Sequence, residues 1–467
     1  MRFDVKVTNL GKLKEGRLKV RPITILTGPN GTGKSFFTKT LYSIFNVINK
    51  NVHHESIVKS IRLINLRLDG IVENINYSSE YDIISIRHLV SGLNSVLEQI
   101  EVATDGDIED YLDFTKSRAS IISELETFFN SYVDDLKSKP KKYTSVSRHV
   151  VSIEKSFKEL KNKFSNSLEH YNDSIAKNLQ SEISDNFQVA DLGELVSFGE
   201  EQSHIIVDDL INIDLGSKGV GFTLGRDFIN EVSSLSRVVF FESPAYWKVR
   251  DALKSARERT YFPFFINKDM PNQLTGVPKY FYDLEEALRV ENKKTSVKDI
   301  DELSRVIKSK LGGEFVFNGD KLIYKDSASG KEISKNLISF GMTNLGIIHT
   351  LLKSNVITPG SFVFIDEPET NLHPKWQVLL MDVLISLAKL NVNIVIATHS
   401  IDMIKALEVG LETIDVESDF MSVHYFDIDG YLLEFDSSDP KSQLVEARSE
   451  LNAPYSELYF KGCALDD

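Results

Sequence analysis

One stretch of the chain has the residue types and spacing of a phosphate-binding loop. Its pattern is G-x-x-x-x-G-K-[ST], filled by Gly28, Pro29, Asn30, Gly31, Thr32, Gly33, Lys34 and Ser35. Glycines let such a loop turn tightly and bring backbone N–H groups close to phosphate oxygens. The lysine reaches the β- and γ-phosphates, and the last hydroxyl coordinates Mg²⁺. The motif therefore predicts a site for a nucleoside triphosphate with Mg²⁺.

The residues on either side of this loop fit the strand and helix that it must join. Residues 23–27 are apolar enough for a buried strand, and residues 35–42 carry apolar side chains at helical spacing. The free N–H groups at the start of that helix would face the phosphates. A glycine turn beside a surface lysine is the alternative, and this context makes it the weaker one.

Two carboxylates end a second apolar run, residues 361–367. Such a run is typical of a buried parallel strand, and α/β sheets place ligands at the carboxyl ends of these strands. Asp366 would hold Mg²⁺ directly or through water, and Glu367 would orient or deprotonate the attacking water. Taken alone, the run fits an ordinary strand and its turn as well as it fits a catalytic segment. Together with the phosphate-binding loop, it favours the catalytic interpretation.

Two further segments carry candidate site residues. His399 ends a third apolar run, where it would donate to the γ-phosphate or to the water, although a single histidine is more often structural. Ser339 opens an amphipathic helix that contains Gly341. The start of that helix would receive an anion, which need not be bound by the same chain.

The composition excludes several classes of protein. The 467 residues carry a net charge of −14 and are 42% hydrophobic, which fits a globular protein and argues against a surface devoted to nucleic acid. A negative net charge is nevertheless compatible with a local basic groove. No apolar run approaches the ~20 residues of a membrane span, and no signal-peptide core is seen. With Cys463 as the single cysteine, we expect a cytoplasmic protein without disulfides or a membrane partner.

The segment between the two halves of the site is largely helical in pattern. Apolar residues recur at three- and four-residue steps from about residue 108 to 180, and Pro140 interrupts them within the lysine-rich stretch 137–142. We expect an antiparallel coiled-coil hairpin whose arms of ~30 residues would reach about 45 Å. Its tip is either a solvated turn or a contact point for nucleic acid or a partner protein.

Together these motifs resemble those of the ABC-type ATPases. The matching features are the P-loop, the long insertion, the Ser339–Gly341 helix start, Asp366–Glu367 followed by Pro368, and Thr398–His399–Ser400. The resemblance covers roughly residues 1–50 and 310–405. It implies an α/β head in which two chains sandwich ATP, with Ser339 and Gly341 of one chain closing on the γ-phosphate held by the other. Hydrolysis would then depend on a homodimer or a higher oligomer.

Within that family the chain departs from the membrane transporters. Phe340 stands where their signature has the first glycine of a pair, and His373–Pro374 follows Leu372 where they have Leu-Asp. The pattern resembles the overcoming-lysogenization-defect, RecF and SMC-like branch, and most of all the ATPase subunits of the PARIS and Septu anti-phage systems. The resemblance also implies a glutamine that senses Mg²⁺ and the nucleophile. Gln188 is the candidate, and an ordinary loop glutamine is the alternative.

The motifs and the sequence patterns together divide the chain into five parts. These are the P-loop part of the head (1–50), a helical insertion (51–185), a lobe that rejoins the head (186–310), the rest of the head (311–410), and a C-terminal β-hairpin and tail (411–467). Overcoming-lysogenization-defect proteins carry a carboxylate-rich nuclease domain after the ATPase. The short tail here has no such cluster, so any effector would be a separate chain.

The interpretation that we favour is an ATPase that acts as the sensor and scaffold of an anti-phage system. It would oligomerise and control a separate effector, expected to be a nuclease, in response to a trigger such as a phage protein. A repair ATPase that clamps DNA is the second interpretation, and a transporter subunit is the third. The acidic net charge suits holding a protein better than coating DNA.

Overall fold

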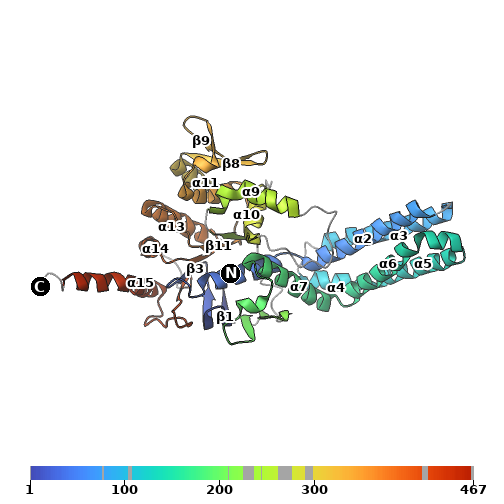
Figure 1. Cartoon of the computed structure of the whole chain (residues 1–467), viewed down its shortest axis with the longest axis horizontal. Coiled ribbons are helices and arrows are strands. Elements are labelled where there is room, and N and C mark those ends of the chain that lie inside the picture. The colour runs from blue at the N-terminus through green and yellow to red at the C-terminus, as the bar shows by residue number, and fades with distance from the viewer. Residues whose placement is uncertain are drawn as a thin grey trace. The chain divides into compact units, whose positions relative to one another are not determined.

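The computed structural model describes residues 2–75, 78–103, 108–208, 210–224, 236–242, 245–260, 276–289, 298–412 and 419–463. They form two compact units. The first comprises the described residues up to Asn49 and from Leu179 onward, and the second comprises those between Lys50 and Asn178. Within the described residues, the first unit holds the sheets and the second consists of helices (Figure 1).

The centre of the first unit is a five-stranded parallel sheet with the order β13-β3-β12-β11-β7. Its strands are β3 (Ile23–Thr27), β7 (Val238–Phe241), β11 (Phe362–Asp366), β12 (Asn393–Ala397) and β13 (Met421–Tyr425). Every residue of β3, β11 and β12 is buried, which explains their continuous apolar sequences. All neighbours are parallel, so their carboxyl ends lie at one edge. The predicted α/β fold is confirmed.

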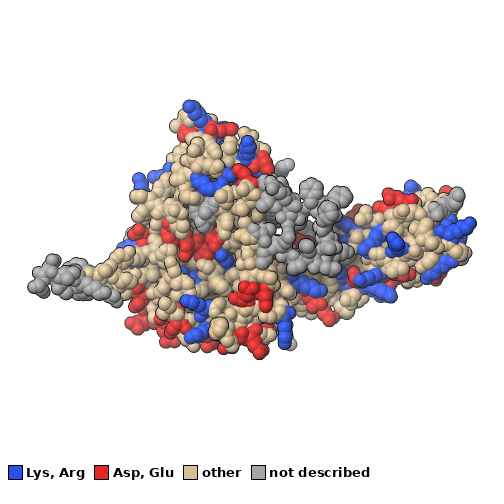
Figure 2. Space-filling model, viewed as in Figure 1, with Lys and Arg blue, Asp and Glu red and all other residues tan. Residues whose placement is uncertain are grey.

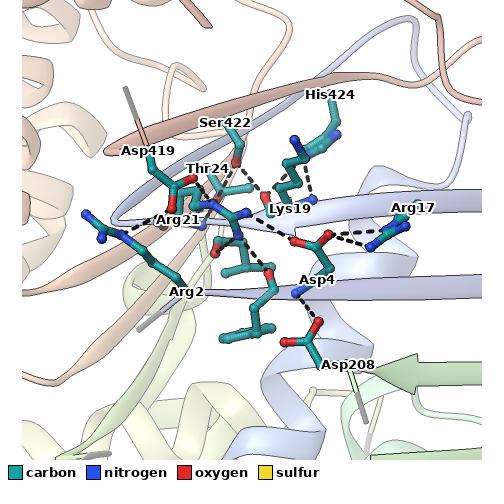
Figure 3. Close-up of polar contacts among 12 residues, drawn as sticks. Arg2, Asp4, Arg17, Lys19, Arg21, Thr24, Asp208, Asp419, Ser422 and His424 are labelled. Carbon is teal, nitrogen blue, oxygen red and sulfur yellow. Dashed lines mark hydrogen bonds and ion pairs between the residues drawn. The ribbon is translucent and has the colours of Figure 1, made fainter. Parts of the chain in front are cut away.

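A second, antiparallel sheet has the order β2-β1-β4-β5-β6. Its strands are β1 (Phe3–Leu10), β2 (Leu13–Val20), β4 (Gln202–Val207), β5 (Ile211–Gly216) and β6 (Gly219–Leu224). Figure 3 shows the polar contacts that tie its first strands to the segment around β13. Arg21 contacts Asp4 and Asp419, and Ser422 Oγ donates to the carbonyl oxygen of Lys19. These contacts join the N-terminal strands to the segment that carries β13.

A small third sheet and the remaining helices complete the first unit. The sheet contains β8 (Gly313–Asn318), β9 (Lys321–Asp326) and β10 (Glu332–Ser334). The helices are α1 (Lys34–Ile48), α9 (Ala245–Thr260), α10 (Lys279–Arg289), α11 (Lys298–Leu311), α12 (Phe340–Lys353), α13 (Pro374–Lys389), α14 (Ile401–Glu412) and α15 (Pro440–Cys463). Short 3₁₀ turns lie at Leu192–Leu195 and Lys335–Leu337.

Aromatic packing holds α1 against the parallel sheet. The ring of Tyr42 lies 5.3 Å from that of Phe240 and 6.1 Å from that of Phe364, and the ring of Phe45 lies 5.0 Å from that of Phe362. Burying a side chain of this size stabilises a fold by roughly 1.5–3 kcal/mol. This packing fixes the start of α1, and so the phosphate-binding loop, at the carboxyl edge of the sheet.

The C-terminal segment differs from the simple hairpin that its sequence indicates. Residues 425–433 do fold back, with an antiparallel bridge between Phe426 and Leu432. The strand before this turn, β13, pairs in parallel with β3 as the edge of the central sheet. Alternating polarity reveals a strand but not its partner, because pairing depends on residues far away in the sequence.

The second unit is an antiparallel arrangement of helices. They are α2 (Val52–Asn74), α3 (Glu80–Ala103), α4 (Ile108–Ser117), α5 (Ala119–Lys137), α6 (Pro140–Ser165) and the greater part of α7 (Ser167–Phe187). Helix α2 packs on α3 and α6, and α5 packs on the same two helices. Buried residues recur at helical spacing, for example Ile57, Ile61, Ile64 and Leu68 on α2.

The predicted two long arms are divided in the structure. The chain leaves helical geometry at Arg118, between α4 and α5, and at Asn166, between α6 and α7. Helices α5 and α6 have 19 and 26 residues, so they reach about 28 and 39 Å. The apolar spacing continues across both breaks, which is why the sequence pattern hides them. No helix in the described ranges has both the length and the apolar character to span a membrane.

Candidate nucleotide-binding site

The predicted phosphate-binding loop connects β3 to α1. Gly28, Gly31 and Gly33 have positive φ angles of 129°, 74° and 105°. A side chain at Gly28 would in addition overlap the carbonyl oxygen of Phe426. Only glycine adopts such angles readily, so these positions need it. The loop therefore has the backbone geometry that turns N–H groups toward a phosphate.

Lys34 begins α1, and its ammonium group lies inside the loop. Nζ donates hydrogen bonds to the carbonyl oxygens of Gly28, at 2.8 Å, and Pro29, at 2.7 Å. The side chain is buried, and burial lowers its pKa, while nearby carboxylates, Glu367 foremost, oppose that shift. Phosphate oxygens would be stronger partners for this cation than neutral carbonyls. The residue is thus placed where the motif predicts.

Ser35 and Asp366 are brought together from α1 and the end of β11. Ser35 Oγ donates to Asp366 Oδ1 at 3.2 Å. Burial raises the pKa of Asp366 to about 6, while the Ser35 hydrogen bond and the ammonium of Lys39 oppose this rise. A hydroxyl and a carboxylate oxygen are ligands that suit Mg²⁺, and a divalent cation would favour the ionised carboxylate. These residues fit the expected metal.

Glu367 and His399 meet at the same edge. Glu367 has a positive φ of 48°, and its N–H donates to the carbonyl oxygen of Ala397 at 2.9 Å. The Nδ1 atom of His399 lies 3.8 Å from Glu367 Oε1 and 3.2 Å from Glu369 Oε1. Strained backbone at a non-glycine residue is typical of functional sites. Here the residue with the positive φ is the candidate catalytic base.

A cavity of about 690 Å³ joins the loop to Glu367. Its lining residues are Gly11, Lys12, Asn30 to Phe36, Gly193, Glu194, Val196 to Glu200, and Glu367. This volume falls within the range of small-molecule sites. The loop and the candidate base thus face one space large enough for a nucleotide.

Ser339 and Gly341 lie outside this lining, at the start of α12. Ser339 caps the helix, its Oγ accepting a hydrogen bond from the N–H of Met342 at 3.3 Å. A side chain at Gly341 would press on Leu372. Neither residue is part of the cavity wall that contains the P-loop of the same chain. That placement is compatible with their expected action on a second chain.

Gln188 also lies outside the described cavity lining. It ends the turn after α7 with a φ of 57°, and its side-chain Nε2 donates to the carbonyl oxygen of Asp185 at 2.6 Å. Its Oε1 accepts a hydrogen bond from the N–H of Gly276 at 2.7 Å. The amide is thus engaged with backbone groups of Asp185 and Gly276.

The pattern that describes one protein family matches residues 23–403. This is more than half of the chain, and it includes the P-loop, Asp366, Glu367 and His399. The family is described as "AAA domain, putative AbiEii toxin, Type IV TA system". The chain belongs to this AAA-domain family. A comparison with curated protein sequences finds no match.

Solved structures with some likeness to this AAA-domain chain include heads of SMC proteins. The Smc head domain of Pyrococcus furiosus, with an extended coiled coil and bound to the C-terminal domain of ScpA, is 11% identical, with 95% of this chain and 98% of that chain covered and a TM-score of 0.40. The SMC head domain of Thermotoga maritima is 10% identical, with coverages of 91% and 94% and a TM-score of 0.33. At these scores we draw no conclusion from them.

Glu242 is a carboxylate of this AAA domain that the sequence argument missed. It follows β7, and because Phe241 is in register with Ile365, Glu242 stands next to Asp366 at the sheet edge. Its Oε1 lies 2.7 Å from Lys39 Nζ, and the hydroxyl of Tyr280 donates to its Oε2. The available signal was an apolar strand ending in a carboxylate, the same signal that identified Asp366.

Glu369 was also missed. Its Oε1 accepts a hydrogen bond from the backbone N–H of His399 at 2.8 Å, in addition to the contact with the imidazole. The carboxylate is buried, so it fixes both the backbone and the ring of His399. It lies three positions after Asp366, and nothing in that spacing indicates that its partner is His399.

Proposed function

We propose that this chain binds ATP with Mg²⁺ and hydrolyses it to ADP and phosphate. The observation that carries the proposal is the juxtaposition of the glycine loop around Lys34 with the Ser35–Asp366 pair at one sheet edge. Backbone N–H groups of the loop would hold the phosphates, and Lys34 would neutralise their charge. The family match supports a nucleotide-binding role.

Each residue at the sheet edge has a defined task in this proposal. Ser35 and Asp366 would hold Mg²⁺, which supplies charge neutralisation at the phosphates when bound. Glu367 would orient the attacking water and accept its proton, since it faces the cavity and lies beside His399. Glu369 would keep His399 in place, and His399 would donate a hydrogen bond to the γ-phosphate or the water.

The test is nucleotide binding and turnover by the purified chain and its Lys34→Ala variant. Binding is followed by calorimetry with ATP and Mg²⁺, and turnover by release of phosphate. We expect the parent chain to bind and hydrolyse ATP and the variant to lose most of both. Absence of ATP binding by the parent, together with no effect of Lys34→Ala on any activity, would contradict the proposal.

The proposal extends to assembly and to a role in defence against phage. Ser339 and Gly341 would act on the P-loop of a second copy, because neither lines the cavity of its own chain. The chain would be the sensor and scaffold subunit that controls a separate effector, expected to be a nuclease. Support comes from the sequence pattern, and the description of the matched family mentions a toxin rather than a transporter.

The second interpretation is a clamp on DNA, and the ion pairs at the helical tip do not favour it. Lys139 pairs with Asp135 at 2.6 Å, and Lys142 pairs with Asp82 at 2.9 Å. Lysines with carboxylate partners are less available to phosphates. Salt-sensitive, ATP-stimulated binding of duplex DNA that is lost on neutralising Lys139, Lys141 and Lys142 would move this interpretation to first place.

A further inference from the structure

One wall of the cavity is not explained by phosphate binding. Residues between Gly193 and Glu200, which precede β4, form it. Within this wall the side chain of Phe198 is fully exposed, at 107% of the reference value. No other phenylalanine in the described ranges is classed as exposed. A single exposed apolar residue is ordinary, so its surroundings decide whether it has a task.

Phe198 is held rigidly at the tip of a tight turn. The N–H of Glu200 donates to the carbonyl oxygen of Ser197 at 3.0 Å, and Gly199 has a φ of 90°. This is the arrangement of a type II turn, in which the third residue is glycine and the second projects outward. Because the backbone of this turn is already fixed, it loses little further conformational freedom when the ring of Phe198 binds a ligand.

The turn is also anchored to the loop between β1 and β2. The N–H of Ser197 donates to the carbonyl oxygen of Asn9 at 2.9 Å, and its hydroxyl donates to that of Gly11 at 2.8 Å. The same loop carries Lys12, whose Nζ stands 4.0 Å from the place that a Cβ on Gly31 would take. The exposed ring is therefore tied to a segment that reaches the P-loop itself.

Two carboxylates complete this wall. Glu194 and Glu200 line the cavity, both are exposed, and neither forms an ion pair within the described ranges. A carboxylate accepts hydrogen bonds and cannot donate them when ionised. An aromatic face flanked by acceptors suits a flat, π-rich group whose edge carries amino hydrogens. The triphosphate-binding loop on the same cavity makes a nucleobase the matching group.

We propose that Phe198 stacks on the base of the bound nucleoside triphosphate and that Glu194 and Glu200 favour a base with an exocyclic amino group, such as adenine. This subsite rests on the proposed nucleotide-binding function, because it uses the same cavity. It adds a source of affinity that does not involve the phosphates. The P-loop holds the charged end of the ligand, and the 197–200 turn holds the other.

Calorimetry with three ligands separates the two ends of the site. The ligands are ATP, ITP, whose hypoxanthine base has no amino group, and inorganic tripolyphosphate, each with Mg²⁺. Phe198→Ala should weaken ATP binding by roughly 5- to 100-fold and leave tripolyphosphate binding unchanged. Phe198→Tyr should retain the parent affinity for ATP. The parent chain should bind ATP more tightly than ITP, and changing both Glu194 and Glu200 to alanine should reduce that preference.

A control variant distinguishes stacking from a general effect on the fold. Tyr455→Ala removes another exposed aromatic ring, on α15 and outside the cavity lining, and should change no affinity. Equal affinity of the parent and Phe198→Ala for ATP would overturn the subsite, as would an equal loss for ATP and tripolyphosphate. If the parent bound neither ligand, the nucleotide-binding function would fail and the subsite with it.

Discussion

Glu367 and Glu369 are two positions apart in the chain and have different tasks in the proposed site because their surroundings differ. Glu367 faces the cavity, and 45% of its side chain is exposed. Glu369 has 8% exposure and is bound to the backbone and ring of His399. An accessible carboxylate can exchange a proton with water, whereas one that accepts fixed hydrogen bonds serves to position its partner.

Replacing Glu367 by glutamine should separate binding from turnover. Glu367→Gln keeps the size of the side chain but removes the base, so ATP affinity should persist while phosphate release falls by about 100-fold or more. Glu434→Gln, an exposed change outside the described cavity lining, is the matched control. Phosphate release at the parental rate from Glu367→Gln would remove this residue from the catalytic role.

A buried histidine should make the second unit sensitive to acid. Burial lowers the pKa of His53 to about 4, and the neighbouring His170, 5.2 Å away between ring centroids, adds to the effect. In the unfolded chain His53 takes up a proton near pH 6.5, whereas in the folded chain it stays neutral down to about pH 4. Stability is therefore lost as the pH falls from 6.5 toward 4.

His53→Phe should reduce that loss. At pH 5 the contribution of His53 is about 2 kcal/mol, so the variant should lose less thermal stability than the parent between pH 7.5 and pH 5. His170, whose pKa is also about 4, keeps part of the sensitivity. The measurement is thermal unfolding followed by circular dichroism at the two pH values. Identical losses in parent and variant would show that His53 does not control the effect.

At the scale of elements, one lysine joins α9 to the start of α12. Lys248 Nζ donates to the carbonyl oxygens of Lys335, at 3.1 Å, Asn336, at 2.9 Å, and Ile338. It also lies 5.3 Å from the centre of the Phe340 ring. Helix α9 follows β7 and Glu242 in the chain. Residues 335–338, which lead into Ser339, are thus held by α9, the helix that follows β7 in the chain.

Lys248→Met should loosen the start of α12 without affecting the P-loop. A hydrogen bond from a charged donor contributes more to stability than one from a neutral donor. Methionine keeps the length of the lysine side chain but removes its charge and its hydrogen-bond donors. If Ser339 serves a second copy as proposed, turnover should fall about 10-fold at unchanged ATP affinity, and Lys248→Arg should restore part of it. Lys331→Met, at an exposed position of the third sheet's connection, is the control. Parental turnover in Lys248→Met would show that this anchor is dispensable.

At the scale of the whole molecule, the proposed ATP sandwich predicts a change of mass. Glu367→Gln should convert from monomer to dimer, or to a higher oligomer, when ATP and Mg²⁺ are added, because hydrolysis no longer reopens the assembly. Adding Ser339→Arg should prevent this, since a bulky cation would block the facing site, while leaving ATP affinity intact. Native mass spectrometry of both variants gives the answer. A nucleotide-independent mass in both would contradict the sandwich.

Co-expression with the proteins encoded next to this chain extends that measurement. A defined complex with a neighbour-encoded protein would support the sensor and effector pair, and the chemistry of the partner would identify the output. An ATP-dependent dimer that takes up duplex DNA instead would favour the clamp. The same preparation, with and without nucleotide, distinguishes the two interpretations.

The sequence determined the parts of this site that depend on local chemistry. Gly28, Gly31 and Gly33 meet a backbone requirement, Lys34 and Ser35 follow at fixed spacing, and the buried strand before Asp366 and Glu367 shows as an apolar run. These features are readable because each is satisfied within a few residues of the chain. The α/β fold follows from them, since buried parallel strands need helices on their faces.

Tertiary structure alone decided which distant residues join that site. Glu242 stands beside Asp366 because β7 pairs with β11, and Phe198 lines the cavity because its turn is bound to Asn9 and Gly11. The hydrogen bonds of Gln188, the candidate that the family resemblance implies, to Asp185 and Gly276 are likewise visible only in the fold. Strand order and long-range hydrogen bonds arise from packing over the whole chain, and no local pattern of residue types records them.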